Sequence, residues 1–421
     1  MKVTGIIAEY NPFHKGHEYH LKETRSTLNS DYIVVVMSGN YVQRGAPTII
    51  DKYSRAEMAL RCGADLVLEL PSCYSTASAE YFAFGGVSIL DKLGVVDDLC
   101  FGTESLDRQI DKNDPEILIQ KFGEIAELQI EEPAQYKEVL QQSLKEGMSM
   151  AAASSEAIGA VLGQEYVALM ARSNNILGVE YLRALKILKS SIKPEPVARM
   201  LSAHKDTQIT MGFSSATAIR NAVFNKYDLN SLSSTVPKAV SEILMDRYLV
   251  TFPIFRDDFS IILGEKLLSA ESADDLAQYF GVSMDLANRF MKLRNEYRTF
   301  NQFRELSYTK NLNKATVGRA LMHITLGIRA ADMTRLYSKH NLNAVKVLGF
   351  RESAAALLSE IKKKGSIQMV TKLADYQPDP DHDGADMIQE TTRMDMLYRM
   401  VAMNKFDVQI PTPFEQEIIK I

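Results

Sequence analysis

The sequence is poor in cysteine and has no long apolar stretch. Its three cysteines, Cys62, Cys73 and Cys100, form no C-x-x-C pair, which argues against a disulfide framework and a cysteine zinc site. We therefore expect small core residues at these positions. No run approaches the roughly 18 apolar residues of a membrane span, and Met1 leads into a strand-like segment instead of a signal sequence. These absences argue against a membrane protein and predict a cytoplasmic location.

The composition is that of a globular protein with two or three domains. The chain has 421 residues, of which 46% are hydrophobic and 24% charged, which excludes disorder, collagen and coiled coil. The net charge is only -5, but residues 286–364 carry an excess of about +11, so the remainder carries about -16. Such asymmetry indicates a docking site for a polyanion. A solvated helical surface is the alternative.

The first hundred residues alternate between strand and helix patterns. Short β-branched runs predict strands at 3–8, 32–37, 66–70 and 99–101, and helical periodicity predicts helices at 52–61 and 77–90. This alternation is typical of an α/β fold with a parallel sheet wound by crossover helices. Such sheets bind ligands at the carboxyl ends of their strands.

Helical patterns dominate the rest of the chain. They cover 116–189, are followed by a strand at 196–201 and a helix that starts near Ser215, and resume after a polar stretch at 230–237. We place a domain boundary at Asp228 and predict mainly helical structure as far as Lys364, where three lysines before Gly365 indicate a helix end. Short strands are expected at 368–373 and 406–410.

The segment after the first predicted strand carries the clearest chemical signal. It places His14, Gly16 and His17 at a strand-to-helix junction. A glycine there lets the backbone approach a ligand, the helix start offers free N–H groups, and imidazoles can donate to phosphoryl oxygens. In nucleotidyl transfer, charge develops on the α-phosphate and the departing pyrophosphate, so fixed donors there supply most of the catalysis.

Two other interpretations of this segment stay open. His14 and His17 could simply be hydrogen-bonded capping residues at a helix start, and the spacing alone does not choose between capping and function. Because His20 lies nearby, the three histidines could also hold zinc. Zinc sites usually add a carboxylate or cysteine ligand at helical spacing, which disfavours that alternative.

A second signal lies two hundred residues further on. Ser215 and Thr217 precede or begin a predicted helix, and Arg220 follows in its first turns. Either hydroxyl could be a plain N-terminal cap. A helix start with hydroxyls and a nearby guanidinium is also suited to clamp the β- and γ-phosphates of a nucleotide.

Together these motifs resemble a known superfamily. The H-x-G-H of residues 14–17 and the S-x-T-x-x-R of residues 215–220 are similar to the Rossmann-like nucleotidyltransferases that include the pantetheine-phosphate and nicotinamide-mononucleotide adenylyltransferases. Ala216 stands where many members have a second serine. A closer resemblance, over nearly the whole chain, is to the bacterial tRNA(Met) cytidine acetate ligase family. It rests on residues 11–17, 38–45, 63–71, 101–104 and 174–178.

The closer resemblance implies a specific reaction. Members of this family activate acetate with ATP to acetyl-adenylate and pyrophosphate, and then transfer the acetyl group to N4 of the wobble cytidine in elongator tRNA(Met). For this chain it implies ATP, Mg²⁺, acetate and tRNA as substrates or partners. It also implies a Rossmann-like nucleotidyltransferase domain over 1–228 and a basic, mainly helical tRNA-binding region over 229–421.

The resemblance also implies which residues contact ATP. Gly102, Arg199 and an asparagine, Asn175 or alternatively Asn174, would complete a site whose phosphates are held by Ser215, Thr217 and Arg220. The nucleotide loop comprises Ile7, Ala8, Glu9, Tyr10, Asn11, Pro12, Phe13, His14, Lys15, Gly16, His17, Glu18, Tyr19 and His20.

Because acetate and ATP are both anions, neutralising groups should be the main catalytic resource. We expect this role of His14, His17, Lys52 and Arg220, together with Mg²⁺ held mostly by the phosphates. Lys52 is included because it begins the helix after the loop at 39–48, although a solvated lysine at a helix start is the alternative. Arg44, in that loop, could contact a carboxylate or lie on the surface.

The basic segment would hold the tRNA. Within it we expect a phosphate-contacting zone that includes Arg298, Arg319, Arg329 and Arg335. Two other functions stay open: a small-molecule adenylyltransferase, which would leave the basic segment without a role, and an RNA-binding protein with a vestigial nucleotide fold, which would not need the histidines. The oligomeric state is left open.

Overall fold

The computed structural model describes residues 1–106, 114–199, 215–225, 229–309, 312–338, 342–378 and 386–421. Asp228, where the domain boundary is predicted, and two cations of the basic segment, Lys310 and Lys339, lie outside these ranges. The last two residues of the strand predicted over 196–201 also lie outside them.

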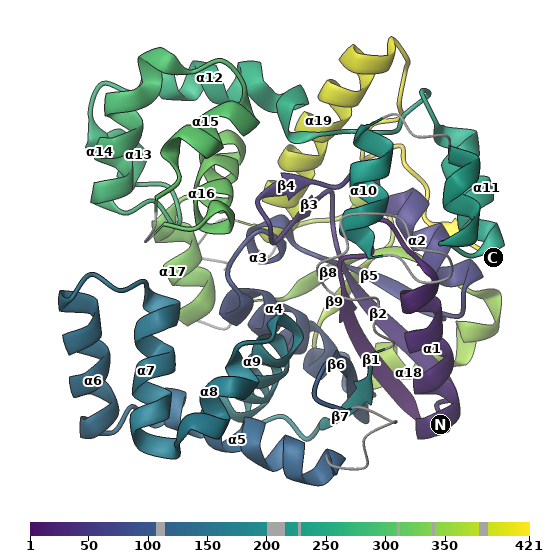
Figure 1. Cartoon of the computed structure of the whole chain (residues 1–421). Coiled ribbons are helices and arrows are strands. Elements are labelled where there is room, and N and C mark those ends of the chain that lie inside the picture. The colour runs from purple at the N-terminus through teal and green to yellow at the C-terminus, as the bar shows by residue number, and fades with distance from the viewer. Residues whose placement is uncertain (107–113, 200–214, 226–228, 310–311, 339–341, 379–385) are drawn as a thin grey trace.

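Among the described residues, an eight-stranded, mostly parallel sheet forms the centre of the molecule (Figure 1). Its strands are β1 (Val3–Ala8), β2 (Tyr32–Ser38), β5 (Leu66–Leu70), β6 (Asp98–Thr103), β7 (Lys193–Ala198), β8 (Ala344–Phe350), β9 (Gln368–Val370) and β10 (Ile419–Lys420). Their order is β10-β8-β5-β2-β1-β6-β7, with β9 paired to β8. Among these pairs, β5 with β8 is antiparallel and the others are parallel. The predicted α/β fold with a parallel sheet is confirmed.

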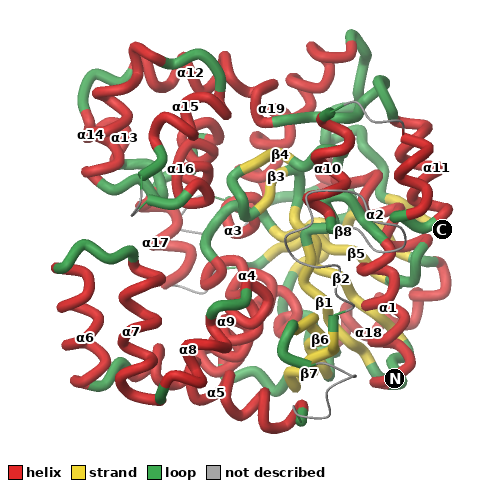
Figure 2. The backbone as a smooth tube through the Cα atoms, in the orientation of Figure 1, coloured by secondary structure: helices red, strands yellow, loops and turns green. Residues whose placement is uncertain are grey.

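The central strands are continuous apolar runs because helices cover both faces of the sheet (Figure 2). In β2, Val34 and Val36 belong to one hydrophobic cluster, and Val35 belongs to another. Successive strand side chains point to opposite faces, so each cluster lies on its own side. The helices before β6 are α1 (Lys15–Leu28), α2 (Lys52–Arg61), α3 (Ser72–Ser75) and α4 (Ala79–Lys92). The first two pack in the second cluster, and the last two pack in the first.

Two further groups of helices precede β8 in the chain (Figure 1). Between β6 and β7 lie α5 (Pro115–Glu131), α6 (Ala134–Lys145), α7 (Met150–Leu162), α8 (Gln164–Met170) and α9 (Ser173–Leu188). After β7 come α10 (Ala216–Phe224), α11 (Lys238–Arg247), α12 (Ser260–Ser269), α13 (Ala273–Ala277), α14 (Met284–Leu293), α15 (Phe300–Ser307), α16 (Lys314–Leu326) and α17 (Ala330–Ser338), with the short 3-10 helices η1 (Leu229–Ser234), η2 (Arg256–Phe259) and η3 (Arg294–Glu296). No helix within the described ranges has the length and apolar character needed to cross a membrane.

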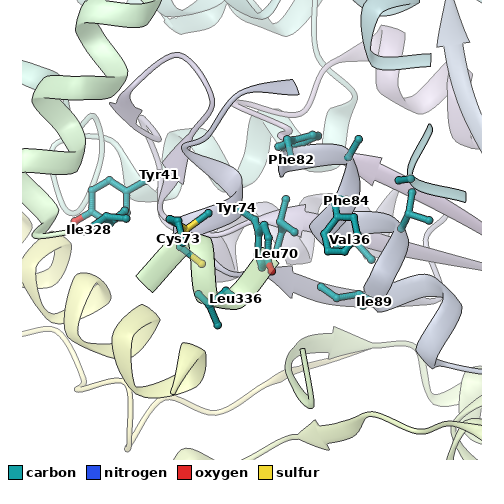
Figure 3. Close-up of a cluster of buried hydrophobic side chains, with 14 of the residues drawn as sticks. Val36, Tyr41, Leu70, Cys73, Tyr74, Phe82, Phe84, Ile89, Ile328 and Leu336 are labelled. Atoms are coloured by element: carbon teal, nitrogen blue, oxygen red, sulfur yellow. The ribbon is translucent and has the colours of Figure 1, made fainter. Parts of the chain in front are cut away.

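Helices α12–α16 form a layer beyond the hairpin of β3 (Tyr41–Val42) and β4 (Ala46–Pro47), and we call them the helical layer (Figure 1). The buried cluster in Figure 3 joins the following helix to the sheet: Leu336 of α17 and Ile328, which precedes it, belong to the same cluster as Cys73 and Tyr74 of α3. The free cysteines Cys73 and Cys100 are buried, as expected for small core residues, whereas Cys62 at the end of α2 is only half-buried.

The chain after residue 228 differs from the predicted helical region in one respect, because it returns to the sheet. It supplies β8, β9 and β10, and two helices, α18 (Ala355–Lys364) and α19 (Met387–Phe406), follow β8, together with η4 (Glu352–Ala354) and η5 (Leu373–Asp375). In β8, Val345, Val347 and Leu348 are fully buried. Because both faces are covered, the segment lacks the apolar–polar alternation that marks a half-exposed strand. The strand predicted at 406–410 is not formed, since α19 runs to Phe406.

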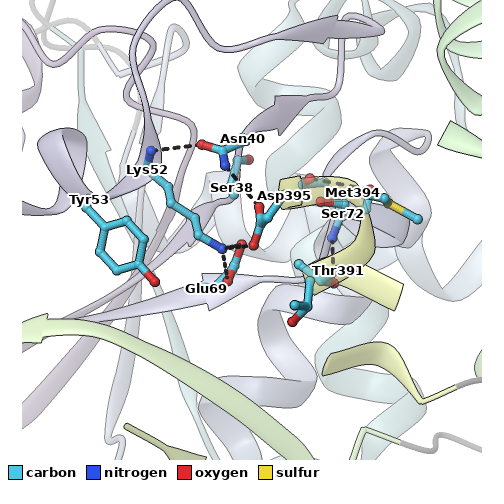
Figure 4. A network of polar contacts seen from close by, with 12 residues as sticks. Ser38, Asn40, Lys52, Tyr53, Glu69, Ser72, Thr391, Met394 and Asp395 are labelled. Carbon is cyan, nitrogen blue, oxygen red and sulfur yellow. Dashed lines mark hydrogen bonds and ion pairs between the residues drawn. The ribbon is translucent and has the colours of Figure 1, made fainter. Parts of the chain in front are cut away.

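A buried ion cluster holds α19 against the beginning of α2 and the carboxyl end of β5 (Figure 4). The Nζ of Lys52 lies 2.7 Å from both carboxylate oxygens of Glu69 and also pairs with Asp395. Their side chains are only 1%, 2% and 4% exposed. Burial disfavours the charged ammonium, but the two carboxylates outweigh it and hold the pKa of Lys52 above its ordinary value. Lys52 is therefore a structural cation and not a solvated surface lysine.

The ion cluster also fixes the loop that carries the hairpin. Asn40 donates from Nδ2 to Oδ1 of Asp395 (2.9 Å), and its Oδ1 accepts the backbone N–H of Lys52 (2.9 Å). Gly39 lies so close that an added Cβ would meet Oε1 of Glu69 at 2.3 Å. The residue that follows β2 must therefore be a glycine for the cluster to close.

We predict that Lys52→Met destabilises the protein by about 3–5 kcal/mol, because it leaves two buried carboxylates without the ammonium that pairs with them. Chemical denaturation followed by circular dichroism would measure the change. The matched control is Lys363→Ala on α18, which removes an exposed ion pair with Glu360 and should change the stability far less, because water screens the pair. Equal losses for the two variants would contradict the structural role of Lys52.

Candidate functional site

The loop between β1 and α1 presents two histidines side by side. His14 caps α1: its Nδ1 accepts the backbone N–H of Gly16 (3.1 Å). The Nδ1 of His17 accepts the backbone N–H of His14 (3.3 Å). Because a neutral imidazole carries its proton on the nitrogen that does not accept, both rings hold it on Nε2. The capping interpretation is thus correct for the geometry, yet each ring keeps one N–H that it can donate to a ligand.

Both histidine rings are held neutral. Burial lowers the pKa of His14 to about 3, with smaller contributions from Arg199 and Arg220, and it lowers the pKa of His17 well below the ordinary value. The two rings are stacked, with centroids 3.6 Å apart. Tyr10 packs against His17 at a centroid distance of 4.7 Å. The site therefore offers fixed neutral donors without protonation at physiological pH.

The ends of β6 and β7 bring an arginine to the histidines. Gly102 lies in β6, and an added Cβ there would approach Cγ of Arg199 at 2.8 Å. Arg199 follows β7, and its backbone N–H donates to the carbonyl of Thr103 (3.1 Å). Its charge contributes to the lowered pKa values of His14 and His17. The carboxyl ends of three neighbouring parallel strands thus meet here, as expected for such a sheet.

Other residues of the predicted nucleotide loop support its shape. Glu9 accepts the backbone N–H of Gln43 (3.0 Å), and Asn11 accepts that of Ile49 (2.9 Å), so both are tied to the loop that carries the hairpin. Lys15 donates to the carbonyl of Ser234 (2.7 Å). The remaining members are placed as follows: Ile7 and Ala8 end β1, Pro12 and Phe13 are buried, Glu18 pairs with Lys22, Tyr19 is half-buried in α1, and Nε2 of His20 lies 3.4 Å from Sγ of Cys100.

The two asparagines at the start of α9 have different surroundings. Asn175 is completely buried, and its amide contacts Thr103 and Ser105 (2.7 Å each) and the carbonyl of Leu169. Asn174 is half-buried and donates to the carboxylate of Glu104. Asn175 therefore fixes the loop after β6, and Asn174 is the more accessible of the two.

Helix α10 is joined directly to the histidine loop. Ser215 caps it by accepting the N–H of Ala218 (3.1 Å). Arg220 donates to the carbonyl of Asn11 (2.7 Å) and to Oγ1 of Thr217 (3.0 Å). Burial, followed by the charge of Arg44, lowers the pKa of Arg220 to about 10. The structure thus brings together two motifs that lie about two hundred residues apart in the sequence.

A cavity of about 510 Å³ opens beside Arg220, between the hairpin, α10 and the helical layer. We call it the arginine cavity. Its lining, among the described residues, contains five cations, Arg44, Arg220, Arg256, Arg304 and Lys314, and one acidic residue, Glu9. No local motif marks Arg256, which precedes the basic segment. The excess of positive charge between 286 and 364 is the only sequence signal for Arg304 and Lys314.

Several predicted residues lie outside these two places. Lys52 lines neither the histidine loop nor the arginine cavity, because its ammonium is held in the buried ion cluster. The four arginines expected to contact tRNA do not line the cavity. Arg298 is exposed, Arg319 contacts Thr316 (3.2 Å), Arg329 contacts Gln278 and the ring of Tyr279, and Arg335 pairs with Asp332 (2.7 Å). Across the described part of the chain, no group of three potential metal ligands is assembled.

Known proteins match the chain over nearly its whole length. The family model of the HIGH Nucleotidyl Transferases matches residues 1–410. The tRNA(Met) cytidine acetate ligase of Acetivibrio thermocellus is 38% identical over 387 residues, covering 89% of each chain. The ligase of the same name from Caldanaerobacter subterraneus subsp. tengcongensis is 38% identical over 379 residues, covering 90% of each chain.

Solved structures agree with this assignment. The apo crystal structure of Thermotoga maritima TmcAL superposes with a TM-score of 0.89 at 31% identity, and the structure bound with alpha-thio ATP superposes with a TM-score of 0.86 at 30% identity. Both cover all of each chain. With more than a third of its residues shared with curated relatives over most of its length, the chain belongs to the tRNA(Met) cytidine acetate ligase family of HIGH nucleotidyl transferases.

Proposed function

We propose that this chain is an ATP-dependent ligase that activates acetate as acetyl-adenylate and transfers the acetyl group to N4 of the wobble cytidine of elongator tRNA(Met). The observation that carries the proposal is the pair of neutral, stacked histidines whose Nε2–H groups are free of capping, with Arg199 and Arg220 beside them. The names of the relatives support acetate as the acyl donor and a cytidine of tRNA(Met) as the acceptor.

The first step joins two anions. A carboxylate oxygen of acetate forms a bond to the α-phosphorus of ATP, the bond from that phosphorus to the bridging oxygen breaks, and pyrophosphate leaves. His14 and His17 would donate from Nε2 to the oxygens on which charge develops, because fixed donors there need no reorganisation. Arg199 and Arg220 would neutralise the phosphates. Mg²⁺ would enter with ATP, held mostly by phosphate oxygens, and screen their charge.

The second step transfers the acetyl group. The N4 amine of cytidine attacks the acetyl carbonyl, AMP leaves, and the amine loses a proton. For the adenylate site we propose Gly102, Arg199, Ser215, Thr217 and Arg220 with the nucleotide loop. Of the two asparagines we choose Asn174 for direct contact, because the Asn175 amide is buried and already hydrogen-bonded. Lys52 is left out, since two carboxylates neutralise its charge.

Product analysis tests the function as a whole. The protein would be incubated with Mg·ATP, labelled acetate and unfractionated bacterial tRNA, and the nucleosides separated after digestion. We expect label in N4-acetylcytidine only when ATP is present. Pyrophosphate release without labelled RNA would leave adenylation intact and contradict the proposed acceptor. Pyrophosphate release that requires a small phosphorylated substrate instead of acetate would favour a small-molecule adenylyltransferase.

We predict that His17→Ala lowers the rate of acetyl-adenylate formation at least a hundredfold, because it removes one fixed donor to the transition state. Acetate-dependent ATP–pyrophosphate exchange would measure it, and tRNA affinity should stay nearly unchanged. Lys22→Ala, on the exposed side of the same helix, is the matched control. A His17 variant with the exchange rate of the control would remove the role assigned to this residue.

The neutral state of the histidines can be tested by NMR. With ¹³C-labelled histidine, the signals of His14 and His20 should not titrate between pH 5 and pH 8, because burial lowers their pKa values to about 3 and about 4. In urea both should titrate near 6.5. Since the unfolded chain binds these protons and the folded chain does not, stability should fall as the pH drops below 6.5. Titration of His14 near 6.5 in the folded protein would contradict neutral donors.

A further inference from the structure

The arginine cavity is continuous with the proposed adenylate site. Glu9, Asn11 and Arg220 line it, and they come from the histidine loop and from α10. Along α10 the lining residues are Thr217, Arg220, Asn221 and Phe224, which are spaced three, four and seven residues from the first and share one face. This face extends about 10 Å from the proposed phosphate clamp towards η2 and the helical layer.

The protein neutralises the positive charge in the outer part of the cavity only in part, because Arg304 and Lys314 share the single carboxylate of Glu305. Arg256 donates from Nε to the carbonyl of Gly45 (2.8 Å) and from Nη2 to the carbonyl of Arg44 (2.9 Å), and neither partner is anionic. The Nε of Arg304 is buried without a hydrogen-bond partner among the described residues, although its Nη2 pairs with Glu305 (2.7 Å). Burial, together with the neighbouring arginines, lowers the pKa of Arg256 to about 9. An anion bound there would offset the repulsion between Arg256 and the neighbouring arginines.

An exposed aromatic ring lies on the same wall. Phe224, the last residue of α10, lines the cavity and is 57% exposed. It packs edge-to-face against Phe255, with centroids 5.2 Å apart and an interplanar angle of 84°. Phe255 in turn lies under the ammonium of Lys405, 4.9 Å from its centroid. Phe255 thus holds the ring of Phe224 in place and leaves it accessible for stacking.

We propose that the outer arginine cavity binds the acceptor nucleotide of the RNA: the cytosine stacks on Phe224, and a backbone phosphate is held by Arg256 and Arg304. Exposed rings that stack unpaired bases and guanidinium groups that match phosphate oxygens are how proteins recognise single-stranded RNA. The nucleotide would then reach the acetyl group from the side of Glu9 and Asn11. The inference rests on the proposed function and names the part of the site that receives the RNA.

The main alternative occupant is ATP itself, whose outer phosphates could reach these arginines. The two ligands differ in what they require. An ATP phosphate site is needed for adenylate formation in the absence of RNA, whereas an acceptor site is needed only for acetyl transfer and RNA binding. An aromatic ring matters for a stacked base and not for a phosphate.

The experiment compares Phe224→Ala and Arg304→Gln with the wild type in two assays. The first is acetate-dependent ATP–pyrophosphate exchange without RNA, and the second is acetylation of tRNA(Met) at varied RNA concentration. We expect exchange within twofold of wild type for both. For Phe224→Ala the KM for tRNA should rise about tenfold to a hundredfold, from the loss of one base stack. For Arg304→Gln, tRNA affinity should fall and its dependence on salt should weaken by about one unit of slope.

Matched controls separate this role from general surface effects. Phe414→Ala removes another exposed phenylalanine, 52% exposed and outside the cavity lining, and Lys266→Ala removes an exposed cation of the helical layer. Both should leave the two assays unchanged. The conservative variants Phe224→Tyr and Arg304→Lys, which retain an aromatic face and a positive charge, should recover most of the tRNA affinity.

Three results would overturn the inference. A parallel loss of exchange and RNA acetylation would assign the cavity to ATP. Variants that behave like their controls in both assays would show that RNA binds elsewhere. If the wild type supports exchange but forms no N4-acetylcytidine, the proposed function fails, and this inference fails with it.

Discussion

The buried contact of Lys52 with Glu69 and Asp395 is the interaction on which the arrangement of the rest depends. It joins α2, β5 and α19, and the last of these begins more than three hundred residues after the first. Each charge can be taken out of water only because the others are present. Helix α19 is therefore packed into the same body as α2 and the central sheet.

From this cluster, a chain of hydrogen bonds leads to the histidine loop. Asn40 connects it to the loop that carries the hairpin, and the backbone N–H groups of Gln43 and Ile49 in that loop donate to the side chains of Glu9 and Asn11. Arg55, fully buried, donates to the carbonyls of Glu9 (2.7 Å) and Ser38 (2.9 Å). The histidines are thus positioned by contacts that begin well outside the site. The hydrogen bonds that their Nδ1 atoms accept fix the tautomer of both rings. Burial, together with nearby positive charge, keeps the rings neutral.

The distribution of charge in space differs from its distribution along the chain. Some of the cations between 286 and 364 form hydrogen bonds within the fold. Arg289 donates to the carbonyls of Ser307 and Leu306, and Arg351 donates to that of Leu60. The cavity gathers Arg44 and Arg256 from elsewhere, next to Arg304. A count of cations in a segment therefore indicates a polyanion without locating where one would bind.

The sequence by itself determined what depends on neighbours along the chain. Repeating apolar positions predict β1 and α2 at their observed bounds, and the spacing of His14 and His17 predicts a helix start with free donors. What depends on distant contacts was decided only by the tertiary structure: β8 joins the sheet because both its faces are covered, and Lys52 is neutralised by a carboxylate at position 395. Local periodicity specifies conformation and solvent-facing sides, but a charge or a strand acquires its role from whichever surface the folded chain brings against it.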